Sequence, residues 1–111
     1  MVKYVSIICR PPGTDRQEVI DYWLNVHAPL VKKSLPELRK YVISFPLPSP
    51  TTQEPPDYDG IVELYFDDFD AMQKALTSPS WQSEERKASS NKIIDYKRLK
   101  SYFVDEHILS V

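Results

Sequence analysis

The sequence predicts a single α+β domain with the element order strand, helix, strand, strand, helix, strand. Three observations predict it: four runs of β-branched and aromatic residues, two main segments with helical periodicity, and prolines that separate them. The 111 residues suffice for one domain, so we assign residues 1–111 to it. A composition that is 41% hydrophobic and 27% charged is ordinary for a globular protein.

The first strand and the first helix meet at a proline-rich turn. Residues 2–9 are β-branched or aromatic with little charge, which predicts a strand covered on both faces. The prolines and the glycine at residues 11–13 end this strand. Thr14 is expected to cap a helix over residues 15–27, because a glutamine follows it at the capping-box position.

This first helix has one apolar face. At about 100° per residue, a narrow stripe holds Ile20, Trp23, Leu24, His27 and Val31. Pro29 lacks a backbone N–H and restrains the residue before it, so we expect a kink or a stop near His27, with another turn after it. The stripe predicts that His27 points inward.

The middle of the chain predicts two strands joined by a long loop. Residues 38–45 and 59–66 are rich in β-branched and aromatic residues. Residues 46–58 contain five prolines, which indicates an extended loop.

The last third predicts a helix, a further helical segment and a strand. Asp67 or Asp68 is expected to cap the helix, whose inward residues are expected to be Phe69, Met72, Ala75 and Leu76. Ser78 followed by a proline is typical of a helix start, so a helical segment is expected up to about residue 88. Residues 99–106 predict the final strand.

This order is the split βαββαβ arrangement of a ferredoxin-like sandwich, a four-stranded antiparallel sheet with helices on one face. Alternate strand residues face opposite sides of the sheet, and neither set carries many charges. The face without helices must therefore also be covered. One chain has no further layer to cover it. A second copy is the economical solution, which predicts a two-fold homodimer.

Composition argues against several classes of function. The net charge of −2 argues against nucleic-acid binding, and no apolar run is long enough to cross a membrane. The two glycines form no phosphate-binding loop, and the two histidines have no metal-ligand spacing, so we expect neither a cofactor nor a metal. A single cysteine and a start without a signal-peptide pattern favour a cytoplasmic location.

Three residues are candidates for catalysis. His27 is either a core histidine satisfied by hydrogen bonds or a general base or acid in a pocket between helix and sheet. Glu63 lies in an apolar strand and needs a partner, which is either a basic residue across the sheet, Arg10 or Lys40, or His27. Tyr41 offers a hydroxyl that could stabilise an oxyanion.

Aromatic residues predict the surface that would hold a ligand. Thirteen aromatics are many for so short a chain, and several lie in predicted strands. They are more often core than ligand cage, yet they offer flat surfaces for a ring. The candidates for binding a hydrophobic small molecule are Tyr4, Trp23, Tyr65 and Phe103.

Four separated motifs carry a resemblance to a known family. Residues 22–31 contain W-x-x-x-H-x-P after an aromatic residue, and residues 35–41 contain P-x-L-x-x-Y. With residues 58–66 and 104–107 they make the chain similar to the EthD family of dimeric α+β barrel proteins. The resemblance implies a pocket role for His27 and points to Tyr41, because members with isomerase activity place the helix histidine in the pocket.

Function follows as three hypotheses. The first is a cofactor-independent isomerase, dehydratase or other lyase acting on a hydrophobic ring compound such as an aromatic polyketide or a lactone. In it His27 moves the proton, Tyr41 donates to the oxyanion and Glu63 assists. The second is a cofactor-free oxygenase of similar fold. The third is a non-catalytic ligand-binding or accessory protein of a degradation pathway.

Overall fold

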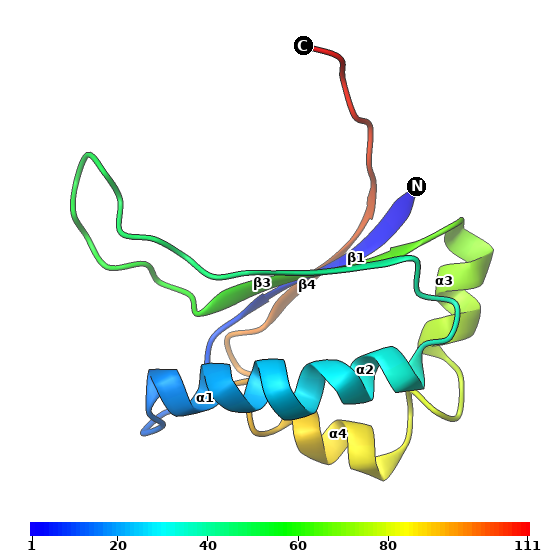
Figure 1. Ribbon diagram of the computed structural model, residues 1–111, viewed down its shortest axis with the longest axis horizontal. Coiled ribbons are helices and arrows are strands. Elements are labelled where there is room, and N and C mark those ends of the chain that lie inside the picture. Colours follow the sequence, from blue (N-terminus) through cyan, green and yellow to red (C-terminus); the bar gives the residue numbers. More distant parts are fainter.

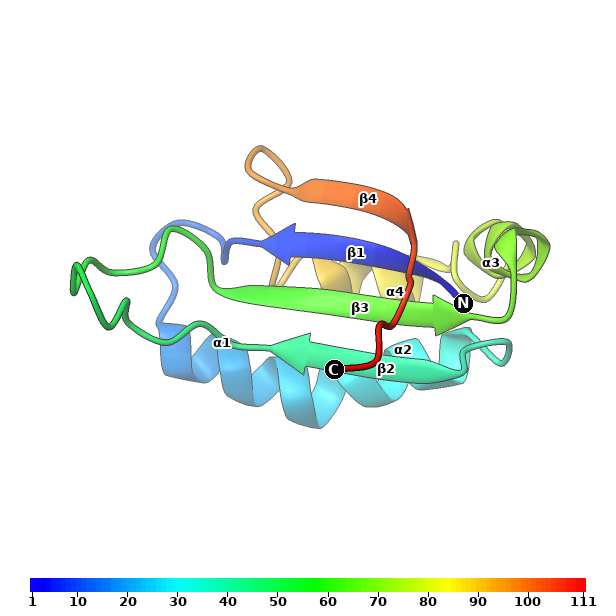
Figure 2. The same cartoon turned by 90° about the horizontal axis from the view of Figure 1, so that it is seen from above.

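Four antiparallel strands form one sheet in the order β2–β3–β1–β4 in a computed structural model that describes residues 1–111. The strands are β1 (Val2–Ile8), β2 (Lys40–Ser44), β3 (Gly60–Phe66) and β4 (Lys100–Asp105). β1 pairs with both β3 and β4, and β2 pairs only with β3 (Figure 2). This order confirms the predicted ferredoxin-like α+β fold, and each of the four strands is shorter than expected.

Helices cover one face of the sheet and leave the other open (Figure 1). The helical layer consists of α1 (Arg16–Tyr22), the π-helical turn η1 (Trp23–His27), α2 (Ala28–Ser34) and α4 (Glu84–Ser90). Helix α3 (Phe69–Leu76) lies at the end of the sheet, and the C-terminal residues extend away from the helical layer. None of these helices has the length and the apolar composition needed to cross a bilayer.

The first helical segment starts and continues differently from the sequence expectation. Asp15 rather than Thr14 caps it, since the Asp15 carboxylate accepts the N–H of Glu18 at 3.0 Å. The helix does not stop near His27 either. At η1 the N–H of Ala28 bonds to the carbonyl of Trp23, five residues back, so the wider turn accommodates Pro29 without a break.

The π turn also changes which residues face inward. A wider turn rotates each residue through less than the 100° of an α-helix, so side chains four positions apart stay aligned. The buried row is accordingly Val19, Trp23, His27 and Val31, whereas Leu24 is 46% exposed. The expected inward position of Leu24 is therefore wrong, and that of His27 is right.

The second half shows three further differences. Asp68 is the cap of α3, and Met72 and Ala75 are buried as expected, but Phe69 is 57% exposed because it lies at the first position of the helix. Helix α4 begins at Glu84 with Ser83 as its cap, whereas the segment after Ser78 forms only turns.

Strand alternation separates the two faces of the sheet. Val62, Leu64 and Phe66 of β3 join the hydrophobic core against the helices. Their neighbours Ile61 and Glu63 point to the open face. The core is tightly packed around Trp23, which is fully buried. Its indole ring lies so near Gly60 that a Cβ on that glycine would be 2.5 Å from the ring.

Candidate active site

A cavity of about 180 Å³ lies between the helical layer and the sheet. Twelve of its sixteen lining residues are hydrophobic. The strands contribute Tyr4, Ser6, Ile8, Tyr41, Val62 and Leu64. The helices and the segment around α4 contribute the polar groups His27, Arg86 and Ser90, together with both tryptophans. An apolar cavity with a few convergent polar groups is typical of a small-molecule site.

His27 is the buried histidine of this cavity, with 5% of its surface exposed. Its Nδ1 lies 2.9 Å from the hydroxyl of Ser89 on α4, and that hydroxyl lies 3.0 Å from the hydroxyl of Tyr22. Burial, and secondarily the positive charge of Arg86, lower the pKa of His27 to about 4. The imidazole is therefore neutral near pH 7 and can accept a proton.

The Ser89 hydroxyl orients the imidazole ring. When Nδ1–H donates to Ser89, the Nε2 atom carries the free lone pair, and when Ser89 donates to Nδ1, Nε2 carries the proton. In the first case the Ser89 hydroxyl can donate to the hydroxyl of Tyr22, and in the second case it can accept from that hydroxyl. This chain of hydroxyls lets the ring change tautomer without leaving a buried polar atom unpaired.

Arg86 brings a positive charge to the same cavity. Its Nε donates to the carbonyl of Trp81 at 2.6 Å, and its Nη1 donates to the hydroxyl of Ser90 at 3.2 Å. The guanidinium stacks on the Trp81 ring, with 3.9 Å between the guanidinium carbon and the ring centroid. Only 8% of the residue is exposed, and burial lowers its pKa.

Tyr41 lines the cavity from β2. Burial raises the pKa of its hydroxyl to about 12, and the indole N–H of Trp23 acts in the opposite direction. That N–H is buried without a partner at hydrogen-bonding distance. Tyr41 is therefore a neutral hydroxyl that can donate a hydrogen bond to a ligand oxygen.

The candidate ligand-binding aromatics fall into two groups. Tyr4 and Trp23 line the cavity together with His27 and Tyr41. Phe103 packs against Tyr4, with 5.3 Å between the ring centroids, but it is 65% exposed and is not part of the cavity lining.

Glu63 and Tyr65 lie on the open face of the sheet, away from His27. Glu63 contacts Lys3 at 2.6 Å, and Lys3 also contacts Glu106 at 2.7 Å. The Tyr65 hydroxyl donates to Glu106 at 2.8 Å. The structure thus separates Glu63 from His27, and the basic partner across the sheet is Lys3 instead of Arg10 or Lys40.

Helix α4 supplies the site residues that sequence reasoning missed. Arg86, Ser89 and Ser90 are all buried, and they recur at the three- and four-residue spacing of one helix face. The signal was present in the sequence as a polar stripe on a short helix. It was missed because such a stripe is more often exposed to solvent than turned inward.

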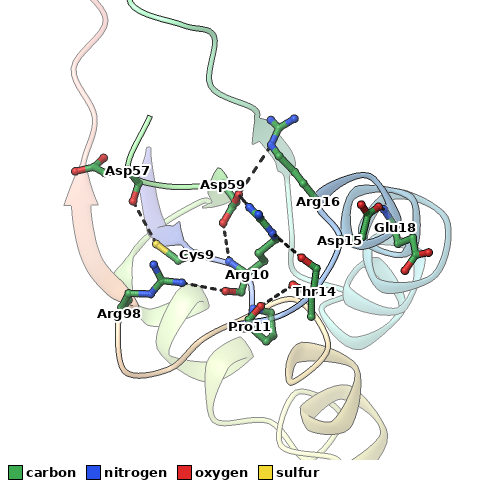
Figure 3. Close-up of polar contacts among 10 residues, drawn as sticks. All are labelled: Cys9, Arg10, Pro11, Thr14, Asp15, Arg16, Glu18, Asp57, Asp59 and Arg98. Atoms are coloured by element: carbon green, nitrogen blue, oxygen red, sulfur yellow. Dashed lines mark hydrogen bonds and ion pairs between the residues drawn. The ribbon is translucent and has the colours of Figure 1, made fainter. Parts of the chain in front are cut away.

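A second, polar pocket lies just beyond the C-terminal end of β1 (Figure 3). Asp59 accepts the backbone N–H of Arg10 at 2.7 Å, pairs with the Arg10 guanidinium and lies 3.9 Å from Arg16. Arg98 donates to the carbonyl of Arg10 at 3.1 Å. These contacts tie the end of the proline-rich loop to β1, so we interpret the cluster as a structural anchor.

Comparisons with known proteins agree with this description. The family model described as "EthD domain" matches residues 11–95. The crystal structure of an EthD-family protein from Bacillus halodurans is 28% identical, with a TM-score of 0.72, and the match covers 96% of this chain and 99% of that chain. A search of the curated proteins finds no significant match.

Two more distant structures share the fold. SnoaB, a cofactor-independent oxygenase from Streptomyces nogalater, is 11% identical with a TM-score of 0.66, and the match covers 97% of this chain and 94% of that one. A dimeric ferredoxin-like protein from Thermobifida fusca is 13% identical with a TM-score of 0.60, covering 93% and 88%. The family model spans most of the sequence, and the chain therefore belongs to the EthD family.

Proposed function

We propose that this protein is a small-molecule enzyme that performs cofactor-independent acid/base chemistry on a hydrophobic ring compound. The observation that carries the proposal is His27, a neutral imidazole that lines a mostly apolar cavity and is held by Ser89. A positioned neutral histidine is the commonest general base in enzymes, and such catalysis contributes roughly 10²–10⁴-fold in rate.

The proposed chemistry divides between two residues. His27 removes a proton from a carbon or an oxygen of the ligand, and it returns the proton at another position or to a leaving hydroxyl. Tyr41, which stays protonated because burial raises the pKa of its hydroxyl, donates a hydrogen bond to the oxyanion that develops. Isomerisation and dehydration both fit this division, and Tyr4 and Trp23 offer flat surfaces for the ring.

A lactone isomerisation tests the proposal. α-Angelica lactone is a single-ring compound whose double bond migrates when a proton is removed next to its carbonyl. We expect the protein to accelerate this migration in buffered D₂O, with deuterium entering the ring, and we expect His27→Gln to lose at least 100-fold of the acceleration. Tyr41→Phe should lose about tenfold. Turnover that survives in His27→Gln would contradict the role of His27.

A cofactor-free oxygenase is the second candidate, because a structure of that description shares the fold. The same neutral His27 would deprotonate a phenol, which would then react with oxygen. Oxygen consumption with an anthrone separates this activity from isomerisation. A protein that binds ring compounds and returns them unchanged would instead be a ligand-binding or accessory protein.

The proposal includes a homodimer formed through the open face of the sheet. This face carries apolar side chains between its charges, including Val5, Val42 and the 52% exposed Tyr102. A similar fold in Thermobifida fusca is dimeric. Light scattering should give about twice the chain mass of 12.9 kDa. We place the dimer in the cytoplasm, where the buried thiol of Cys9 stays reduced.

A further inference from the structure

Arg86 is a buried cation to which the protein gives no counter-charge. Four arginines pair with carboxylates, either at the surface or at Asp59. In contrast, no carboxylate oxygen lies within 4.0 Å of the Arg86 guanidinium. None of the residues that line the cavity is an aspartate or a glutamate. A buried charge without a partner is costly, so its presence in a cavity points to a ligand that supplies the opposite charge.

The guanidinium is also held ready to bind. Trp81 and Ser90 fix its Nε and Nη1, and the stacked Trp81 ring fixes its plane. Its Nη2 has no hydrogen-bond partner in the chain and is not among the buried atoms that lack one, so this edge stays accessible. A planar, pre-oriented donor is suited to a carboxylate, with which arginine forms short charge-assisted hydrogen bonds.

We propose that the ligand of this cavity is a ring compound bearing a carboxylate, which pairs with Arg86 while the ring lies against the apolar walls. The inference deepens the proposed function, because it names the ligand class of the same cavity. The volume of about 180 Å³ limits the buried part to a single ring, since an apolar cavity of roughly 150 Å³ holds one benzene molecule.

Carboxylate binding would also act on His27. Arg86 now lowers the pKa of the imidazole, and the other titratable groups of the cavity lining are the hydroxyls of Tyr4, Tyr41 and Tyr96. A bound carboxylate offsets the charge of Arg86 and so raises the pKa of His27. The ligand would thereby strengthen the base that acts on it, an effect that a neutral ligand of the same shape would not have.

Pairs of acid and amide test the inference. Benzoate and benzamide have nearly the same shape, as do phenylacetate and phenylacetamide, and only the acids carry a charge. The fluorescence of Trp23 and Trp81, the only tryptophans of the chain, reports binding because both line the cavity. We expect at least one acid to bind tenfold or more tightly than its amide, to outcompete inorganic phosphate, and to shift the His27 titration upward in an NMR experiment.

Variants of Arg86 separate recognition from folding and from catalysis. Arg86→Gln should abolish the preference for the acid, and Arg86→Lys should keep part of the preference. His27→Gln should keep the preference even though it loses turnover, so recognition and catalysis fail separately. Equal binding of acids and amides, no binding of any of the four compounds at 10 mM, or a preference that persists in a folded Arg86→Gln protein would overturn the inference.

Discussion

The imidazole of His27 and the hydroxyl of Ser89 meet at 2.9 Å between η1 and α4, 62 residues apart in the sequence. This hydrogen bond joins the helix that carries the proposed base to the helix that carries the buried arginine. The Ser89 hydroxyl also forms a hydrogen bond with the hydroxyl of Tyr22, a half-buried residue nearer the surface. The pair therefore fixes the orientation of the His27 ring and connects it to the hydroxyl of Tyr22.

Removing the Ser89 hydroxyl tests this relationship. Ser89→Ala leaves Nδ1 of His27 buried without a partner, which should cost about 1–3 kcal/mol of unfolding free energy. We expect the rate of lactone isomerisation to fall at least tenfold, because the ring loses its orientation. Tyr22→Phe is the matched control, since it removes the outer hydroxyl and leaves the bond from Ser89 to His27. A Ser89→Ala protein with the full rate would show that Ser89 does not orient the base.

Acid should destabilise the protein through His27. The folded state keeps the imidazole neutral down to about pH 4, whereas the unfolded chain binds a proton near pH 6.5. The unfolded state thus binds more protons between these values, and unfolding free energy falls as the pH drops through them, by up to roughly 3 kcal/mol. Urea unfolding at pH 7 and pH 4.5 measures the difference in unfolding free energy. The His27→Gln protein should show a smaller difference between the two pH values.

Alanine substitution should destabilise the protein at both glycines, for a different reason at each. Gly60→Ala places a methyl group against the fully buried Trp23, so we expect a loss of about 1–3 kcal/mol and altered binding in the cavity. Gly13→Ala meets no atom within 4 Å but strains a backbone with φ of +77°, at a cost of about 1 kcal/mol. Thermal unfolding measures the loss of stability of each variant, and tryptophan fluorescence reports changes around the cavity. A shifted fluorescence spectrum is expected only for Gly60→Ala.

Adjacent residues of β4 test the dimer. Tyr102 points to the open face and Phe103 to the helical side, as their pairing with Val5 and Tyr4 requires. Tyr102→Glu should yield monomers in light scattering at micromolar concentration, because it buries a charge between the sheets. Phe103→Glu changes a more exposed residue and should leave the dimer intact. The reverse result would place the interface elsewhere.

Sequence patterns predicted the fold well because strands and helices here follow their ordinary periods. The run of β-branched and aromatic residues in β3 and the apolar row ending at Val31 were visible without a structure. The π turn was not, since nothing in a 100° projection reports where a helix widens, and Leu24 was therefore placed inward when it is exposed.

The site was predicted only in part, for a physical reason. His27, Tyr41, Tyr4 and Trp23 gather at one cavity because they occupy the helical side of the sheet or the inward side of η1. Glu63 lies one residue from Leu64, and that single step turns it to the opposite face. The polar stripe that contains Arg86 was visible in the sequence, but its inward direction depends on a tertiary contact between α4 and η1, which local sequence does not report.

The underwound turn explains why the histidine and the proline of W-x-x-x-H-x-P occur as a unit in this chain. Pro29 lies two residues after the wider turn, which accommodates its missing N–H, and that turn aligns Trp23 with His27 over the cavity. A related sequence that keeps the histidine but has alanine two residues later would be free to form a regular α-helix and would aim its imidazole in another direction. The proline two residues on is therefore as much a part of the local geometry as the histidine itself.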